Sequence, residues 1–484
     1  MQFDLKRVGL LLGPSVFLLV LLLPNPAPLS LDAWHVVALA GFMLVWWVTE
    51  AVPIPVTAIL PLVILPYFGI EGLDLKTVAA PYANPIVFLF MGGFMIALAM
   101  ERWNLHRRIA LNIVKLTGTN ANGIVFGFML ATAFLSMWIS NTATTVMMLP
   151  IALSVIGLLQ GAQSSEQDQK GLKNFAISMM LGIAASANVG GTATIIGTPP
   201  TVVFAGYIKQ TFDYEVGFTE WLKMGLPFAS IMLLAIYFVI VRVFYPNRLG
   251  KFEGAQAVID TELSKLGKMT IGERRTLIVF ISTAFLWVFR NQLNALFKLL
   301  LPSLQLSDTG IAMLATVVLF IFPVNWKKQE FILKWGDTEK LAWGILLLFG
   351  GGLSLAGALA HTGIIDMIGD QFKNAAGVGF LIMLGLTAVS LFLTEIMSNL
   401  ALVAVFLPVV GGIAVGMDLD PLYLCIPVTL AASCAFMLPM STPPNAIVFA
   451  SGYIKIHQMA RAGILLNIVA IILITLIAVN FIPS

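Results

Sequence analysis

The sequence predicts an all-α integral membrane protein, in which a bundle of helices crosses the bilayer many times. Of its 484 residues, 59% are hydrophobic and only 11% are charged, whereas soluble domains carry roughly 25% charged residues. The mean hydropathy is +0.95. Apolar runs near the length of about 20 residues that a helix needs to cross a bilayer recur along the whole chain. These runs are continuous rather than alternating, so we expect helices and not a barrel.

The first apolar run, Val8–Leu23, follows Lys6 and Arg7 and resembles the start of a secretory signal. No small-residue cleavage site follows it, so we expect residues 1–30 to be retained as a first transmembrane helix. The longest polar segment, 245–275, holds six Lys and Arg residues, which predicts that it is cytoplasmic. Lys6 and Arg7 place the N-terminus on the same, cytoplasmic side, in a multi-pass protein of the plasma (inner) membrane.

The chain contains one pattern twice. Ser140-Asn141 recurs as Ser398-Asn399, 258 positions later (398 − 140), and each Ser is followed by a proline ten residues on. Three blocks match in the same order: Phe88–Met100 with Leu346–Leu359, Ser140–Pro150 with Ser398–Pro408, and Gly197–Lys209 with Ser441–Lys455. We therefore predict an internal duplication. Its parts are repeat 1 (31–246), a basic loop (247–273) and repeat 2 (274–484).

Each repeat carries two predicted helix breaks. The pairs Pro199-Pro200 and Pro443-Pro444 interrupt any helix, because proline lacks the amide hydrogen and clashes with the preceding turn. The Ser-Asn motifs interrupt apolar runs with polar side chains. In membrane proteins built from repeats, broken helices near the middle of the bilayer form the binding sites. Four breaks in two copies therefore predict one pseudo-symmetric site.

The chemistry of these breaks is narrow, because they offer Ser, Thr and Asn side chains, carbonyls and helix-end amides, with no Lys or Arg. Carbonyl and hydroxyl oxygens suit a hard cation such as Na⁺, and helix N-terminal amides suit an anion. We therefore predict coupled binding of an anion and a cation. The alternative is that the small and polar residues only pack helices together. That role is expected for the glycine-rich stretch 344–360.

The sequence does not predict an enzyme. It has no Gly-x-Ser-x-Gly motif and no phosphate-binding loop. Its four histidines are His35, His106, His361 and His457. They are scattered along the chain and lack the spacing of metal ligands. The net charge of +3 gives no indication of a nucleic-acid partner, and none is predicted.

Two acidic residues, Glu50 and Glu395, are expected at membrane depth. Each is either a structural acid at a helix end or part of a proton or cation relay, because intramembrane carboxylates are often functional. The sequence leaves both readings open.

With these motifs in view, the chain resembles the divalent anion/sodium symporter family of di- and tricarboxylate transporters. The likeness lies in "WWVTEAVPIP", "SNTAT", "GTPP", the second Ser-Asn and "STPPNAIVFASGY", spread from about Trp46 to Tyr453. It implies a homodimer with about eleven transmembrane helices in an inverted repeat, and two re-entrant hairpins near 81–101 and 341–361. It also implies an elevator mechanism, in which a transport domain slides against a scaffold. An odd number of helices puts the C-terminus outside.

The resemblance further implies the ligands, with at least two Na⁺ ions. The first Na⁺ would bind Ser136, Ser140, Asn141 and the backbone near Gly197, and the second would bind Thr394, Met397, Asn399 and the backbone near Ser441. The residues implied for the substrate are Ser140, Asn141, Thr142, Ser398 and Asn399, with Thr198, Pro199, Thr442 and Pro443 close by.

The chain departs from the family pattern in the second block, where Leu400 and Leu402 stand at the two positions that usually supply a Thr. This change narrows the pocket toward a C4 dianion such as succinate, malate or fumarate, or it means that the second carboxylate is held elsewhere. We predict a Na⁺-coupled symporter that imports C4-dicarboxylates. The alternatives are a Na⁺-independent dicarboxylate exchanger, tricarboxylate or sulfate transport on the same fold, and a non-transporting membrane scaffold.

Overall fold

The structure, a computed structural model, describes residues 5–118, 120–161, 166–250, 253–300, 303–373 and 378–481. Three parts of the sequence predictions lie outside the described residues: residues 1–4 of the predicted first helix, Lys251 of the basic loop, and residues 482–484 of repeat 2. Within them the protein is helical except for one small antiparallel pair, β1 (Pro323–Asn325) with β2 (Glu330–Phe331).

The helical segments before the basic loop are named in chain order, as a first group in residues 5–102 and a second group in residues 105–244. The first group is α1 (Leu5–Leu22), α2 (Leu31–Thr49), α3 (Ile54–Thr57), α4 (Leu60–Ile64), η1 (Leu65–Phe68), α5 (Leu75–Ala79), η2 (Ala80–Ala83) and α6 (Pro85–Arg102). The second group is α7 (Leu105–Leu116), α8 (Ala121–Ser136), α9 (Asn141–Gly161), α10 (Glu166–Gly191), α11 (Pro199–Phe212), α12 (Phe218–Tyr237) and η3 (Phe238–Phe244).

The helical segments from the basic loop onward are named in the same way, as a first group in residues 253–361 and a second group in residues 364–481. The first is α13 (Glu253–Leu266), α14 (Ile271–Val288), α15 (Arg290–Leu300), α16 (Asp308–Ile321), η4 (Trp335–Lys340) and α17 (Trp343–His361). The second is α18 (Ile364–Asp370), α19 (Gly379–Leu393), α20 (Asn399–Gly416), α21 (Pro421–Ala432), α22 (Pro443–Ala450) and α23 (Ile456–Phe481).

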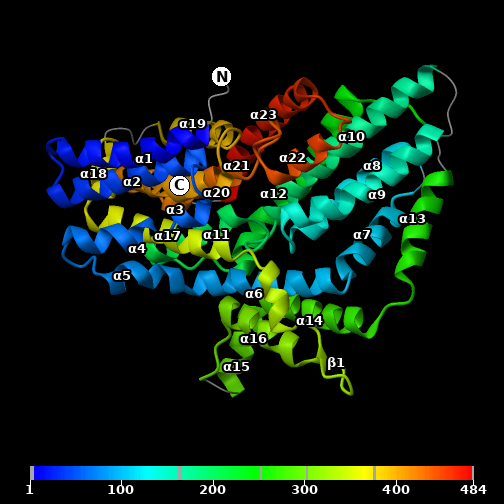
Figure 1. Cartoon of the computed structure of the whole chain (residues 1–484), viewed down its shortest axis with the longest axis horizontal. Helices are drawn as coiled ribbons and strands as arrows, with labels where there is room; N and C mark the ends of the chain where they lie inside the picture. The colour runs from blue at the N-terminus through cyan, green and yellow to red at the C-terminus, as the bar shows by residue number, and fades with distance from the viewer. Residues whose placement is uncertain are drawn as a thin grey trace.

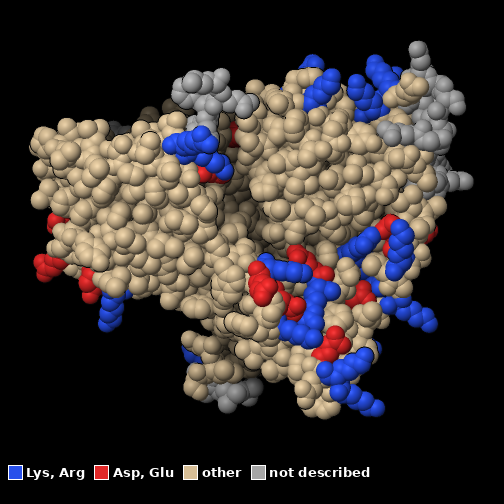
Figure 2. Space-filling view, in the orientation of Figure 1, with Lys and Arg blue, Asp and Glu red and all other residues tan. Residues whose placement is uncertain are grey.

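The fold is that of a membrane protein. Among the described residues, eight helical stretches are long and apolar enough to span a bilayer, or nine if α14 and the helix after it, bent by 74°, are one span. Shorter apolar helical segments accompany them. Figure 2 shows a broad uncharged surface, with charged side chains gathered at the lower right over α7, α13 and α14. Many large apolar side chains are exposed on this surface, as a lipid-facing protein requires.

The helices of the two copies interleave rather than forming separate lobes (Figure 1). Helix α22 packs against α9 and α10, and α11 packs against α20, α21 and α17. The buried core runs through both repeats, and the broken helices of both copies are part of it.

The two segments predicted to form hairpins, near 81–101 and 341–361, do not form them. Residues 85–102 and 343–361 form single helices, α6 and α17, of 18 and 19 residues. Their glycines allow close helix packing. A Cβ added at Gly92 would lie 2.7 Å from the side chain of Ala312, and one at Gly351 would lie 2.2 Å from the Ala58 carbonyl oxygen. Close helix packing therefore accounts for the glycines in these two stretches, and no turn is needed to explain them.

Instead, the chain is interrupted at the Ser-Asn motifs. Helices α8 and α9 are separated by 137–140 and lie in contact, and α19 and α20 are separated by 394–398 and also touch. The predicted basic loop is also more than a loop, because it contains α13. Lys115 of α7 pairs with Asp260 of α13 (2.8 Å), and Arg108 of α7 pairs with Glu273 of α14 (2.8 Å).

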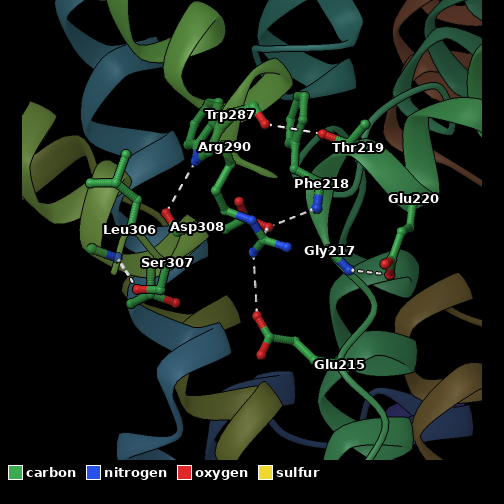
Figure 3. Close-up of polar contacts among 12 residues, drawn as sticks. Glu215, Gly217, Phe218, Thr219, Glu220, Trp287, Arg290, Leu306, Ser307 and Asp308 are labelled. Carbon is green, nitrogen blue, oxygen red and sulfur yellow. Dashed lines mark hydrogen bonds and ion pairs between the residues drawn. The ribbon is translucent and has the colours of Figure 1, made fainter. Parts of the chain in front are cut away.

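A buried ion pair joins α12 to α15 and α16 (Figure 3). Arg290 lies 3.0 Å from Asp308 and 3.4 Å from Glu215, and the amide of Phe218 donates to Asp308 over 2.7 Å. The indole of Trp287 donates to the Asp308 carbonyl (3.1 Å). These bonds fix the start of α12 against the corner where α14 ends and α16 begins.

Candidate functional site

The four predicted breaks open onto one cavity of about 1590 Å³. The structure brings together at its wall the predicted residues Ser140, Asn141, Thr142, Gly197, Thr198, Pro199, Met397, Ser398, Asn399, Leu400, Ser441, Thr442 and Pro443. Two predicted residues, Ser136 and Thr394, are fully buried behind this wall. Leu402, the second position where the family pattern has Thr, is buried and is not among the lining residues.

Four helices begin at this cavity. Helix α9 begins at Asn141, α11 at Pro199, α20 at Asn399 and α22 at Pro443, and all four residues line it. A helix N-terminus carries partial positive charge and free amides, but the two prolines that begin α11 and those that begin α22 have no amide hydrogen. The hydroxyls of Ser140 and Thr442 cap α9 and α22, whereas no side chain caps the first turn of α20. The wall is therefore suited to an anion although it has no Lys or Arg at the breaks.

Behind each Ser-Asn motif, three oxygens converge. The hydroxyl oxygen of Ser136 lies 2.6 Å from Asn141 Oδ1 and 2.7 Å from the carbonyl oxygen of Ala187, and we call these the first oxygen group. The hydroxyl oxygen of Thr394 lies 2.7 Å from both Asn399 Oδ1 and the carbonyl oxygen of Ala432, the second oxygen group.

The two oxygen groups share one geometry. A hydroxyl has one hydrogen and can donate to only one of its two partners at a time, so each group is rich in lone pairs. Such oxygens are the ligands that hard cations prefer. Sequence reasoning found the side chains but missed the carbonyls of Ala187 and Ala432. No sequence signal points to them, because a backbone carbonyl is presented by the end of a helix and not by a residue type.

The first Thr-Pro-Pro break (192–198) is held by neutral groups. The hydroxyl of Thr194 donates to the carbonyl of Met137 (2.6 Å), and the indole of Trp221 donates to the carbonyl of Thr192 (2.9 Å). Gly197 lies against Gly191, where an added Cβ would be 2.3 Å from the Gly191 carbonyl oxygen. Only glycine fits this close approach.

The second break (433–442) is held by a carboxylate. Glu395 is 3% exposed, and it accepts hydrogen bonds of 2.7–3.2 Å from the amides of Phe436, Met437 and Leu438, the hydroxyl of Ser441 and the side-chain amide of Asn467. Of the two readings left open for Glu395, this geometry matches a structural acid. Glu50 differs, since its half-exposed carboxylate lies 3.9 Å from Lys6 at the cavity wall.

Asn188 was missed by sequence reasoning although it lines the cavity. It lies on α10 of repeat 1, and its side-chain amide donates to the Ala435 carbonyl (3.0 Å) and lies 3.2 Å from the Thr442 hydroxyl. It therefore links the first copy directly to the second break. A signal was present, since an Asn inside the apolar run 181–191 needs a polar partner.

Interrupted helices that meet at one cavity, with polar residues at the interruptions, are typical of membrane transporters. The chain belongs to the sodium:sulfate symporter family, since the family described as "Sodium:sulfate symporter transmembrane region" matches residues 5–483. This is a family of transporters and not of enzymes.

The curated relatives agree with this assignment. The chain is 40% identical over 480 residues to a sodium-dependent dicarboxylate transporter, SdcS, of Staphylococcus saprophyticus, covering 99% of this chain and 92% of that protein. It is 39% identical over 481 residues to SdcS of Staphylococcus aureus, covering 99% and 91%.

Two solved transporters share the fold. The MtrF efflux pump of Neisseria gonorrhoeae matches with a TM-score of 0.55 at 15% identity, over 97% of this chain and 94% of its own. The YdaH transporter of Alcanivorax borkumensis matches with a TM-score of 0.56 at 11% identity, over 90% and 97%. At these identities the likeness concerns the fold alone.

Proposed function

We propose that the protein is a Na⁺-coupled symporter that imports C4-dicarboxylates such as succinate, malate and fumarate. The observation that carries the proposal is the meeting of four helix N-termini and two oxygen groups at one cavity. The first feature suits an anion and the second suits cations. The names of the SdcS relatives, sodium-dependent dicarboxylate transporters, support the same substrates.

The substrate carboxylates would bind at the two Ser-Asn motifs, against Ser140, Asn141, Thr142, Ser398 and Asn399. One Na⁺ would bind at the first oxygen group with Ser140 and the Gly197 backbone. A second would bind at the second oxygen group with the backbone of Met397 and Ser441. Each Asn would then contact one Na⁺ and the substrate. The binding of Na⁺ and the binding of substrate would therefore depend on each other.

Electrostatics explain why the cation is needed. Hydrogen bonds to a carboxylate contribute roughly 1.5–3 kcal/mol each, and a dianion loses far more hydration than a few such bonds replace. The breaks hold no Lys or Arg, while Lys6 and Arg7 lie at another part of the cavity wall. Bound Na⁺ would supply the missing positive charge. The dianion would then enter the membrane interior as part of a nearly neutral complex.

The transport cycle follows from the same arrangement. The eleven crossings would be α1, α2, α3–η1, α6, α10–α11, α12–η3, α14, α16, α17, α21–α22 and α23, with α8–α9 and α19–α20 as re-entrant hairpins. This count makes the repeats inverted and puts the C-terminus outside. The cavity reaches Lys6, Arg7 and Glu50, which would lie on the cytoplasmic side, so this state would be inward-facing. A homodimer would anchor the scaffold while the cavity-bearing helices move as an elevator.

The test is uptake of labelled succinate into proteoliposomes that contain the purified protein, with an inward Na⁺ gradient or with choline in place of Na⁺. We expect uptake only with Na⁺, and inhibition by malate and fumarate. Uptake that is indifferent to Na⁺ but stimulated by internal dicarboxylate would make the protein an exchanger. Stronger inhibition by citrate or sulfate than by malate would indicate that the substrate is a tricarboxylate or sulfate. No uptake of any of these anions would favour a non-transporting membrane scaffold.

A further inference from the structure

The two copies differ at the residue that follows the hydroxyl of each oxygen group. Ser136 is followed by Met137, whereas Thr394 is followed by Glu395. Met137 is the first residue of the break before α9, and Glu395 is the second residue of the break before α20. Only the second copy therefore has a carboxylate on the residue that follows the hydroxyl of its oxygen group.

Glu395 is bound entirely by donors. Its partners are three consecutive backbone amides, one hydroxyl and one side-chain amide, and both carboxylate oxygens accept. Four of these five donors are amide groups, which can only donate, so they match the acceptor oxygens of a carboxylate. The negative charge is thus spread over dipoles and is not paired with a basic side chain among these contacts.

The carboxylate is connected to the cavity on two sides. Thr394, its neighbour in the chain, supplies the hydroxyl of the second oxygen group. Ser441, which donates to Glu395 over 2.7 Å, lines the cavity just before the N-terminus of α22. A change at Glu395 therefore reaches the second oxygen group through the backbone and reaches the second break through the hydrogen bonds.

We infer that the charge of Glu395, next to the second break, makes the second half bind Na⁺ more tightly than the first. This inference rests on the proposed function. At a separation of about 10 Å in a partly buried site, the attraction between opposite charges changes a binding constant by roughly tenfold. The first half, with Met137 at the matching position, lacks this contribution, so Na⁺ binds at the second oxygen group before the first.

The experiment measures the Na⁺ concentration for half-maximal succinate uptake in proteoliposomes, at saturating succinate, for the wild type and three variants. Glu395→Gln removes the charge and keeps the size, and we expect roughly a tenfold higher half-saturating Na⁺ with most of the maximal rate kept. Glu395→Asp keeps the charge and Asn467→Ala removes one donor. Both should stay within about threefold of the wild type, because the charge remains.

The outcomes separate the two claims. A wild type without Na⁺ dependence would overturn the proposed function and this inference together. A Na⁺-dependent wild type with an unchanged Glu395→Gln variant would overturn the inference alone, as would Glu395→Asp shifted as far as Glu395→Gln. If Glu395→Gln fails to fold, the role of the charge is tested by the thermal stabilisation that Na⁺ gives to the purified wild type and to the other two variants. Na⁺ should stabilise Glu395→Asp and Asn467→Ala as it does the wild type, and a tenfold weaker response in either would contradict the role of the charge.

Discussion

The two halves of the cavity have the same oxygen geometry but are held in place by different chemistry. Ser136 and Thr394 each lie 2.6–2.7 Å from an Asn side-chain oxygen and a helix-end carbonyl. The first break is held by hydroxyl and indole donors and by Gly197, whereas the second is held by the carboxylate of Glu395. The positions of the oxygens have therefore been kept while the support around them has diverged.

The halves also differ in what they offer a substrate. Thr142 follows Asn141 in the first half and Leu400 follows Asn399 in the second, and both line the cavity. The first half thus has one more hydroxyl for a carboxylate, and the second has a nearby negative charge for a cation. We expect the first half to contribute more to substrate binding and the second to contribute more to Na⁺ binding.

The largest effect is expected where the halves are alike. Asn141→Ala and Asn399→Ala should each lower Na⁺-driven succinate uptake at least a hundredfold, because each amide is placed to serve both an ion and a carboxylate, and several hydrogen bonds are lost together. The assay is initial uptake rate per amount of reconstituted protein. Asn112→Ala is the matched control, since that amide donates only to the Arg108 carbonyl on the surface of α7. An active Asn141→Ala variant would remove the site from this cavity.

An intermediate effect is expected when one hydroxyl of an oxygen group is removed. Ser136→Ala and Thr394→Val should each raise the half-saturating Na⁺ concentration about tenfold, since a buried partner lost from such a group costs roughly 1–3 kcal/mol. The exchange variants Ser136→Thr and Thr394→Ser should remain within about threefold, because they keep the hydroxyl. If an exchange variant is impaired as much as a removal, the two groups are not equivalent in the way their distances indicate.

The smallest effect is expected at the position where the halves differ in polarity. Leu400→Thr should change the ratio of succinate to citrate affinity about fivefold and leave the Na⁺ response within a factor of two, because it adds one donor to the cavity wall. Competition of unlabelled acids against labelled succinate measures the ratio. Leu402→Thr is the control, since Leu402 is buried away from the lining. Equal profiles for Leu400→Thr and the wild type would show that Leu400 does not contact substrate.

The sequence predicted the membrane class, the helix breaks and most of the cavity residues, because Ser-Asn and Thr-Pro-Pro are local signals with a physical reason to interrupt a helix. It failed where the answer depends on packing. Gly92 and Gly351 stay helical because a neighbouring helix lies against them, and that contact is not encoded near them in the chain. The partners of Glu395 were also hidden, because backbone amides leave no mark in a sequence.

The most direct test of coupled binding at this cavity is the affinity of the purified protein for succinate, measured calorimetrically in detergent over a range of Na⁺ concentrations. If both ligands share Asn141 and Asn399, succinate affinity should rise with Na⁺ until it saturates. The affinity for Na⁺ should rise by the same factor when succinate is present, because coupling between two ligands is reciprocal. A succinate affinity that does not change between Na⁺-free and Na⁺-saturated protein would contradict a site built from both oxygen groups.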